Sequence, residues 1–266
     1  MRSVVVIPTY QEADNVDRLL RSIRSHAPDL DIMIVDDNSP DGTADIADRL
    51  ASELGGIEIV RRPGKAGLGV AYRHGFRHAL SRGYDVIGQM DADLSHDPTV
   101  LPQLRARLAE GFDVCVGSRY VPGGSAPNWG WVRRQLSRWA NSYARAMLKL
   151  NFNDATTAFR FYKADVLEGI DIDGTTANGY LFQIETGFRV SNHGYRVAEI
   201  PITFLDREAG ASKMAVFETM VETAFRVTWW GLAIRAPRFT AVIRKTAPGS
   251  YLEARVRNSK QQSDQG

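Results

Sequence analysis

Cysteine is scarce in this sequence: the 266-residue chain contains only one, Cys115. A single cysteine excludes an internal disulfide and a zinc site built from cysteine ligands. Long apolar runs are also missing, because the longest one near the end of the chain, residues 227–234, has eight residues, whereas a membrane span needs about 18 to 20. The first apolar run is too short for the core of a signal peptide. We therefore expect no transmembrane helix and a cytoplasmic location.

An excess of charge of one sign is missing as well, since the net charge is only +2. This balance argues against nucleic acid as a partner. Residues 236–266 hold six basic and two acidic residues, a local charge of +4, which leaves −2 for the rest of the chain. A basic tail behind an apolar, tryptophan-bearing segment is typical either of a solvated chain end or of contact with an anionic membrane face. The sequence leaves both interpretations open.

Hydrophobic residues make up 44% of the chain, which is enough for a substantial core. The first half alternates short apolar runs, expected as strands, with helix-like stretches. The strands are expected at 3–7, 32–35, 57–60, 86–90 and 114–117, and the helices at 16–26, 43–54, 70–82 and 101–110. This alternation predicts an α/β fold, with a mostly parallel sheet covered by helices on both faces.

The second half of the chain changes character. It predicts helices at 131–150, 181–193 and 214–232, and two short strands at 197–200 and 202–205. The helix at 131–150 is basic and amphipathic, and the last helix carries Trp229 and Trp230. We interpret residues 1–235 as one catalytic domain, with acceptor- or membrane-facing helices near 131–150 and 214–234. Residues 236–266 are expected to form a loose basic tail.

Polar clusters follow four of the five expected strands of the first half. They occupy residues 8–12, 36–43, 91–98 and 118–120. Ligands of such sheets bind beyond the carboxyl ends of the strands, so we expect these clusters to form one site. Taken alone, the second cluster is more typical of turn and helix-cap chemistry than of a binding site, because Asp36, Asp37 and Asp41 are ordinary turn and cap residues.

The sequence Asp91-Ala92-Asp93 is the sharpest chemical signal. Two carboxylates one residue apart at a strand end can approach one cation, and their mutual repulsion is costly without it. Hard divalent cations take oxygen ligands and often keep water or phosphate oxygens. Asp91 and Asp93 therefore predict a Mg²⁺ or Mn²⁺ site that holds a phosphate group. The alternative role, capping the helix that begins at Pro98, suits Asp97 better.

Other polar motifs are less specific. Arg119, Arg133, Arg207 and Lys213 are candidate phosphate contacts, although each alone is an ordinary surface charge. The glycines of residues 64–69 form neither a P-loop nor a dinucleotide fingerprint, which would need a third glycine where Tyr72 stands. We expect a tight turn there, with Lys65 near the ligand. Of the five histidines, only His96 is expected close to the site.

Taken together, the motifs resemble those of inverting family-2 glycosyltransferases with a GT-A fold, and among these the polyprenol-phosphate (dolichol-phosphate) mannose synthases. The resemblance covers about residues 3–232. It rests on Pro8-Thr9-Tyr10-x-Glu12, Asp36-Asp37-x-Ser39-x-Asp41-Gly42-Thr43, Lys65-x-Gly67-Leu68-Gly69-x-Ala71-Tyr72, Asp91-Ala92-Asp93-Leu94-Ser95-His96, Gly117-Ser118-Arg119-Tyr120 and Arg207-x-x-Gly210-x-Ser212-Lys213.

The resemblance implies a GDP-mannose donor, a polyprenyl phosphate acceptor and a Mg²⁺ or Mn²⁺ cofactor. It implies a nucleoside pocket lined by Pro8, Tyr10, Glu12, Ile34 and Asp36, a diphosphate that meets Asp91, Ala92 and Asp93 through the metal, and phosphate contacts from Ser95, Arg119, Arg133, Arg207 and Lys213. Catalysis would fall to Asp91, Asp93, Arg119, Arg207 and Lys213. The chain lacks the C-terminal membrane spans of many relatives. We therefore expect a peripheral protein on the cytoplasmic face of the membrane, which leaves room for a separate membrane-anchoring protein.

Three positions depart from the family pattern: Gln11 replaces Asn, Ala158 replaces Gly and Leu181 replaces a Lys of some relatives. Other functional classes are also compatible with the sequence. An Asp-x-Asp phosphatase normally carries its motif after the first strand, which disfavours that class. A non-catalytic nucleotide-sugar-binding protein, a polyprenyl-phosphate glucosyltransferase and a transferase acting on a cell-wall or natural-product acceptor stay open.

Overall fold

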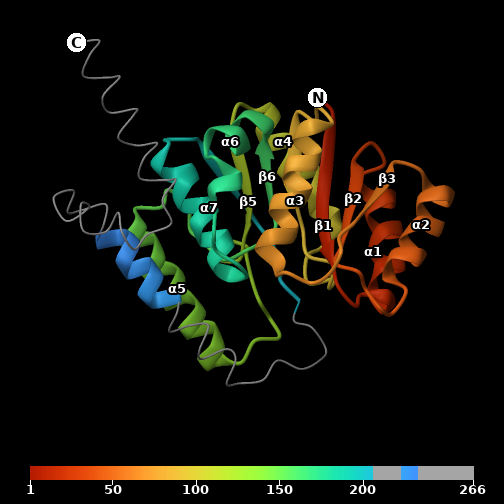
Figure 1. The fold of residues 1–266 in the computed structure, drawn as a ribbon. Helices are drawn as coiled ribbons and strands as arrows, with labels where there is room; N and C mark the ends of the chain where they lie inside the picture. Colours follow the sequence, from red (N-terminus) through yellow and green to blue (C-terminus); the bar gives the residue numbers. More distant parts are fainter. Residues whose placement is uncertain (206–222, 233–266) are drawn as a thin grey trace, which may run out of the picture.

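The computed structural model describes residues 1–205 and 223–232 (Figure 1). A seven-stranded sheet runs through it in the order β3-β2-β1-β4-β6-β5-β7. The strands are β1 (Ser3–Thr9), β2 (Asp31–Asp36), β3 (Ile57–Arg61), β4 (Val86–Gln89), β5 (Val114–Ser118), β6 (Arg160–Lys163) and β7 (Val197–Pro201). Only β6 runs antiparallel to its neighbours, β4 and β5, among these seven strands. The predicted α/β fold with a mostly parallel sheet is confirmed.

Helices connect the strands. They are α1 (Ala13–His26), α2 (Thr43–Leu54), α3 (Leu68–Ser81), α4 (Leu101–Ala109), α5 (Trp131–Leu148), α6 (Ala164–Gly169) and α7 (Tyr180–Asn192), with short 3₁₀ turns η1 (Pro98–Val100) and η2 (Ile172–Gly174). Residues 223–232 form a further helix. No helix within the two described stretches is long and apolar enough to cross a membrane.

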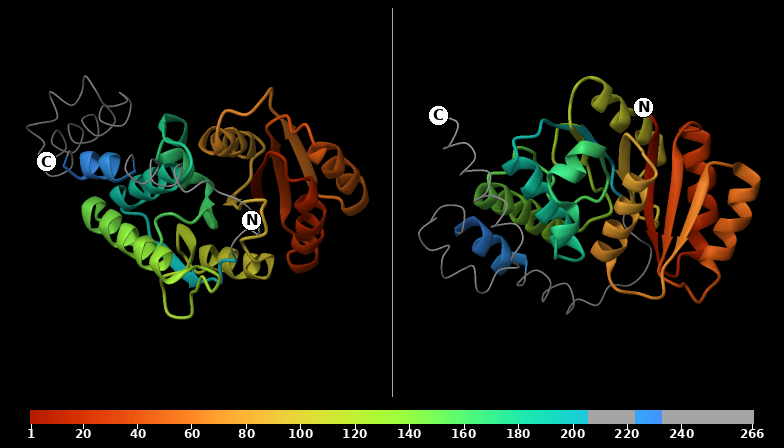
Figure 2. Two further views of the ribbon diagram at one scale, coloured as in Figure 1. Left: turned by 90° about the horizontal axis from the view of Figure 1, so that it is seen from below. Right: turned by 45° about the horizontal axis from the view of Figure 1, so that its top comes forward.

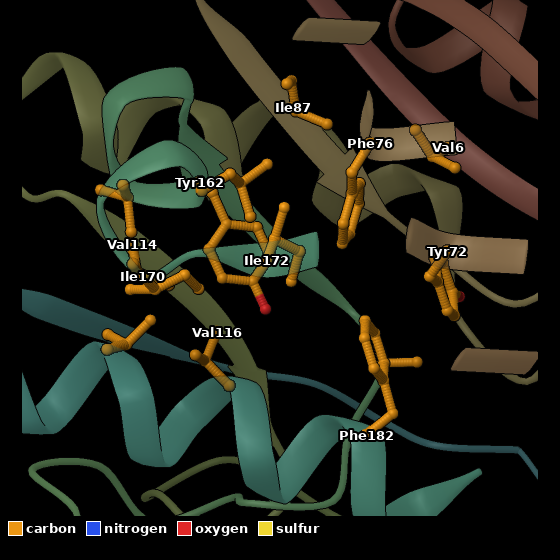
Figure 3. Close-up of a cluster of buried hydrophobic side chains, with 14 of the residues drawn as sticks. Val6, Tyr72, Phe76, Ile87, Val114, Val116, Tyr162, Ile170, Ile172 and Phe182 are labelled. Atoms are coloured by element: carbon orange, nitrogen blue, oxygen red, sulfur yellow. The ribbon is translucent and has the colours of Figure 1, made fainter. Parts of the chain in front are cut away.

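Two hydrophobic clusters cover the two faces of the sheet. Helices α1, α2 and α4 pack on one face, and α3, α5, α6 and α7 pack on the other. Neighbouring residues of a strand serve opposite clusters, because side chains alternate along an extended backbone. Val4 and Val6 of β1 pack with α3, whereas Val5 and Ile7 pack with α1. Figure 3 shows the α3 and α7 side of the core. This sandwich fixes the strand ends where the polar clusters lie.

The last described helix lies far from α1 and α2, at the opposite end of the molecule (Figure 2). Its Thr228 shares a hydrogen bond of 2.5 Å with the hydroxyl of Tyr143 on α5. Its Trp230 stacks on Phe188 of α7 with ring centroids 6.4 Å apart. The helix expected at 214–232 is therefore observed over 223–232, and the remainder of that expectation lies outside the described residues.

One expected strand is not observed, and one observed strand was not expected. Residues 202–205 do not form a strand, because their backbone bonds go to the loop after β5: Ser125 donates to Ile202 and Phe204 donates to Ser125. Only an isolated bridge joins Ser125 and Thr203. Strand β6 is absent from the sequence-based expectations. Its two ends, Arg160 and Lys163, are charged, and this hides a four-residue strand from a search for apolar runs.

Candidate active site

The four polar clusters meet at one edge of the sheet, as expected. Strands β1, β2 and β4 pair in parallel. Strand β5 has the same direction as β4, because both run antiparallel to β6, which lies between them. Their carboxyl ends therefore all open toward the same side, where residues 8–12, 36–43, 91–98 and 118–120 begin. We call these four clusters the loop edge.

The Asp-Ala-Asp loop after β4 has a defined shape. The Ser95 amide donates to Oδ1 of Asp93 at 3.1 Å, and the Asp91 amide lies 3.4 Å from Nδ1 of His96 as a donor. The His96 ring is buried and stacks on Phe159 at 4.9 Å. The buried His96 ring therefore supports the backbone of the Asp-Ala-Asp loop through its hydrogen bond with the Asp91 amide.

Asp97 has the role expected of it. Its carboxylate accepts the Thr99 amide at 2.9 Å and caps η1. The carboxylates of Asp91 and Asp93 are thus not the cap of η1, and their metal role stays a prediction.

The donor set at this loop suits a particular kind of metal. In residues 1–205 and 223–232, no group of three or more histidine, cysteine or acidic side chains is arranged to hold a metal ion. A structural zinc site would need four such ligands. Mg²⁺ and Mn²⁺ instead bind through one or two carboxylates and complete their shell with water and phosphate oxygens. Asp91 and Asp93 fit this second pattern.

Tyr72 of α3 contacts the same loop. Its hydroxyl donates to Oδ1 of Asp91 at 2.8 Å, and its ring is fully buried. Burial raises the pKa of the Tyr72 hydroxyl well above its usual value, and the charge of Asp91 raises it further. The hydroxyl therefore stays protonated and remains a donor. Sequence analysis gave Tyr72 no role in the site.

The loop after β2 behaves as a turn, which was one of its two interpretations. The buried Asp36 carboxylate accepts the Thr9 hydroxyl at 2.9 Å, and the Ser39 hydroxyl and amide at 2.6 and 2.9 Å. Asp41 accepts the Thr43 hydroxyl at 2.6 Å. These bonds tie the ends of β1 and β2 together and shape the wall of the loop edge beside them.

The predicted nucleoside-pocket residues divide into two groups. Tyr10 is partly exposed at the edge, and the Glu12 carboxylate accepts a hydrogen bond from the side-chain amide of Asn15 at 2.8 Å. Pro8 is buried in β1, opposite Val35. Ile34 is fully buried among the side chains of α1 and α2. The Ile34 side chain thus packs in the core, and its place in the nucleoside pocket stays a prediction.

The glycine-rich segment forms the expected turn into α3. Gly67 stands at φ +100, and a Cβ on Gly69 would lie 2.4 Å from the carbonyl oxygen of Ala177. Neither position has room or backbone freedom for an ordinary side chain. The turn places the ammonium of Lys65 4.1 Å from the centre of the Tyr10 ring. Lys65 thus lies beside a predicted nucleoside-pocket residue.

Arg119 has a partner that sequence analysis did not assign. Its guanidinium binds Asp154 through two contacts, Nε–Oδ2 at 2.8 Å and Nη2–Oδ1 at 2.7 Å. Both side chains are buried. Burial alone would raise the pKa of Asp154, but the adjacent Arg119 charge outweighs it and holds this pKa below its usual value. An arginine after a buried strand implies a nearby acid, but nothing in the sequence identifies Asp154.

The other predicted phosphate ligands come from separate segments of the chain. Arg133 is exposed on α5, and its guanidinium lies 4.4 Å from the Trp129 ring, which Arg119 also faces at 5.2 Å. Ser95 is buried, and its hydroxyl has no hydrogen-bond partner in the described part of the chain. Ala92 is buried in the loop. Arg207 and Lys213 lie outside the described residues.

Of the three departures from the family pattern, Gln11 is exposed, whereas Ala158 and Leu181 fall on buried positions. Ala158 packs in the cluster on the α3 and α7 side of the sheet. Leu181 is 5% exposed in the first turn of α7. At both positions the side chain is accommodated by packing against neighbours.

An aromatic face spans α5 and helix 223–232, two helices joined by the hydrogen bond between Tyr143 and Thr228. We define it as the exposed side chains of α5 and of helix 223–232: Trp131, Val132, Leu136, Trp139, Phe225, Trp229 and Leu232. Trp131 is 72% exposed and Phe225 is 69% exposed. The two adjacent tryptophans of the last helix separate: Trp230 packs on the core, whereas Trp229 belongs to the exposed face and stacks on Phe225 at 6.4 Å. Exposed apolar patches of this kind mark interaction sites.

Comparison with known proteins agrees with this geometry. Residues 4–171 match the family Glycosyl transferase family 2. A polyprenol monophosphomannose synthase from Mycolicibacterium smegmatis is 43% identical over 91% of this chain and 92% of its own length. An undecaprenyl-phosphate mannosyltransferase from Micrococcus luteus is 46% identical over 88% of this chain and 96% of its own length.

The fold recurs among solved structures. The mannosyltransferase of Pyrobaculum calidifontis in complex with GDP-Man and Mn²⁺ has a TM-score of 0.58, with 17% identity over 97% of this chain and 79% of that one. The match to the family extends over more than half of the chain, and the two curated relatives match nearly all of it. The chain belongs to glycosyl transferase family 2.

Proposed function

We propose that the protein transfers mannose from GDP-mannose to a polyprenyl phosphate and yields polyprenyl-phosphate mannose with inverted configuration. The observation that carries the proposal is the similarity of nearly the whole chain to two proteins named for mannosyl transfer to a polyprenol phosphate. The Asp91 and Asp93 pair at the carboxyl end of β4 supports it, because it provides oxygen ligands at the edge where the fold binds ligands.

The acceptor needs little activation. A phosphate monoester has a second pKa of about 6, so its oxygens are largely anionic at neutral pH. The protein therefore has no need of a strong general base. Its task is to align the acceptor with the sugar carbon and to stabilise the departing diphosphate.

One displacement accounts for the inversion. An acceptor phosphate oxygen forms a bond to the anomeric carbon of mannose on one face. The bond from that carbon to the GDP oxygen breaks on the other face, and GDP leaves with the electron pair. A Mg²⁺ or Mn²⁺ ion bound by Asp91 and Asp93 would neutralise charge that develops on the diphosphate.

The chain's own residues supply the remaining alignment. Arg119 is held by Asp154 at the end of β5, and Arg133 faces Trp129 at the start of α5. Both are proposed to contact phosphate groups, together with Ser95, Arg207 and Lys213. Tyr10, Glu12 and Asp36 at the ends of β1 and β2 are proposed to shape the nucleoside pocket.

The aromatic face is proposed to lie on the cytoplasmic surface of the membrane that carries the acceptor. Tryptophan and phenylalanine favour the boundary between headgroups and acyl chains, and arginine side chains can reach the headgroups. The same face is where a separate membrane-anchoring protein would bind, if the chain has one as a partner. In either case the lipid phosphate is presented beside α5 and the loop edge.

The test uses purified protein with a short polyprenyl phosphate and either Mg²⁺ or Mn²⁺. GDP-mannose, UDP-glucose and UDP-N-acetylglucosamine are supplied in parallel, and the sugar-phosphate lipid is identified by mass spectrometry. We expect product from GDP-mannose alone. Product from another donor would overturn the proposed donor, and absence of product with every donor, despite nucleotide binding, would overturn the proposed reaction.

A further inference from the structure

Tyr72 lies where the core meets the Asp-Ala-Asp loop. Its ring stacks almost parallel to Phe182 of α7, with centroids 5.8 Å apart and an interplanar angle of 2°. It also stacks on Phe76, one turn further along α3, at 5.7 Å. Figure 3 shows Tyr72 and Phe76 on α3 and Phe182 on α7, facing one another in the buried cluster. Among Tyr72, Phe76 and Phe182, the polar side-chain atom is the Tyr72 hydroxyl, which donates to Asp91 Oδ1.

The backbone that carries Tyr72 is held as firmly as its ring. The turn before α3 packs against residues 177 and 178, where Gly69 leaves no room for a Cβ. Arg73, the next residue of α3, donates to the Ala177 carbonyl at 3.1 Å. A buried aromatic side chain on a fixed helix has few rotamers available. The position of the Tyr72 hydroxyl is therefore set by the core.

We propose that Tyr72 is a positioning residue for the divalent-metal site, and that its hydrogen bond holds the Asp91 carboxylate in the orientation that lets Asp91 and Asp93 bind one ion. The proposal rests on the metal role of Asp91 and Asp93 in the proposed function. Partners of metal-binding side chains commonly change metal affinity by about 10- to 100-fold when they are removed.

The stack between Tyr72 and Phe182 also links the Asp-Ala-Asp loop to α7. Phe182 belongs to α7, which also packs against helix 223–232 through Phe188 and Trp230. The orientation of Asp91 therefore depends on packing between α3 and α7, whose contacting residues Tyr72 and Phe182 are 110 positions apart in the sequence. A change that loosens this packing should weaken metal binding without touching a metal ligand.

The test compares two buried tyrosines. Tyr72→Phe removes the hydroxyl that contacts Asp91. Tyr162→Phe is the matched control, because Tyr162 is also fully buried, packs against Phe76 and donates to Gln89 at 3.2 Å. Mn²⁺ binding in the presence of GDP is measured by the loss of the free-ion electron paramagnetic resonance signal, and folding is measured by the melting temperature.

We expect Tyr72→Phe to weaken Mn²⁺ binding by about 10- to 100-fold, with Tyr162→Phe within about twofold of the unchanged protein. Unchanged affinity in Tyr72→Phe would overturn the proposal. An equal loss in both variants would also overturn it, since the effect would then come from general damage to the core.

A double-mutant cycle sharpens the result. In an Asp91→Asn background, Tyr72→Phe should have no further effect on Mn²⁺ affinity, because the carboxylate that it positions is already gone. Fully additive effects would contradict the proposal. If Tyr72→Phe does not fold, Phe182→Leu tests the same chain of contacts, with an expected loss of Mn²⁺ affinity of about threefold to tenfold and an unchanged affinity as the contradicting result.

The experiment separates this inference from the proposed function. Mn²⁺ and GDP binding need no sugar transfer, so a failed mannosyl transfer leaves the binding comparison intact. Conversely, active transfer with normal Mn²⁺ binding in Tyr72→Phe would sustain the proposed function and refute the positioning role.

Discussion

The loop edge and the aromatic face belong to the same chain but present opposite kinds of surface. At the loop edge, two charged side chains are buried and bonded: Asp36 is 1% exposed and accepts from Thr9 and Ser39, and Asp37 is 4% exposed and pairs with Arg62. On the aromatic face, large apolar side chains such as Trp131 are left in water. Burying a charge is costly unless it is paired, and exposing apolar area costs about 25 cal/mol per Å².

Each region thus departs from the average surface in the direction that its proposed ligand requires. A nucleotide diphosphate needs fixed polar groups, which gain nothing from mobility and must be held before it arrives. A lipid needs an apolar surface, which the aromatic face supplies without fixed polar geometry. We therefore expect substitutions at the loop edge to act by changing the orientation of polar groups. Substitutions on the aromatic face should act by changing the apolar area that is available for binding.

The largest expected effect is at the buried ion pair behind the loop edge. Asp154→Asn leaves the Arg119 charge buried without a carboxylate. Removing one partner of a buried pair typically destabilises a protein by about 3–5 kcal/mol. We expect this loss in the free energy of unfolding, measured by urea denaturation. The control is Asp173→Asn, which breaks the exposed pair with Arg77 and should cost about 0–1 kcal/mol. Equal costs in the two variants would refute the structural role of the Asp154 pair.

The same pair predicts a pH dependence. Arg119 holds the pKa of Asp154 below the ordinary carboxyl value of 3.8. A lowered pKa in the folded state means that the pair contributes its full stability above pH 3.8, and that this contribution falls as the pH drops through the folded-state pKa. The stability difference between the unchanged protein and Asp154→Asn should therefore shrink below about pH 4. A difference that grows on acidification would show that the sign is wrong.

A slightly smaller effect is expected at the metal site. Asp93→Ala removes one of the two proposed metal ligands, and we expect transfer to fall by about 100- to 1000-fold, the scale for losing one preorganised group that stabilises the transition state. Asp97→Asn is the control in the same loop, since Asp97 only caps η1. The readout is the initial rate of mannosyl transfer at saturating Mn²⁺. Comparable losses in both variants would point to loop distortion instead of metal loss.

Substitutions on the aromatic face should weaken binding to membranes. Trp131→Ser and Phe225→Ser each remove a side chain that is more than two-thirds exposed. Burying such a side chain in a membrane boundary is worth about 1.5–3 kcal/mol, so each change should weaken binding to anionic vesicles by about 10- to 100-fold. Flotation with liposomes measures this vesicle binding. Trp230→Phe, which keeps a ring against Phe188, is the control and should float like the unchanged protein. Unaltered flotation of the two serine variants would remove the membrane role of this face.

The smallest expected effect concerns Cys115 in β5. Burial raises the pKa of its thiol to about 12, so almost no thiolate exists near neutral pH. Native protein should therefore resist a maleimide reagent at pH 8, and the denatured protein should react fully. Rapid labelling of the native chain, followed by mass spectrometry, would contradict the closed packing of this part of the sheet.

The sequence was sufficient where the signal is local. Five strands of the first half were expected within a few residues, because each is a short apolar run bounded by a polar loop. Their shared edge followed from the rule for parallel sheets. The Asp-Ala-Asp loop and its Asp97 cap were expected from residue type and spacing alone.

The sequence was insufficient where a role depends on a distant partner. Arg119 and Asp154 are 35 positions apart, and Arg160 is buried because the carbonyls of Ala155 and Gln183 accept from it. No local pattern reports such pairs. Trp229 and Trp230 are alike in sequence, but adjacent residues of a helix point about 100° apart, so only packing decides which one is exposed.

One measurement tests the central claim most directly. GDP-mannose labelled in the sugar is incubated with the protein and Mn²⁺, using vesicles that contain either polyprenyl phosphate or the corresponding free polyprenol. The account predicts label in the organic extract only with polyprenyl phosphate, because the acceptor must arrive already anionic. Equal labelling of the free alcohol would contradict this account, and so would failure of the phosphate to accept label while the protein binds GDP.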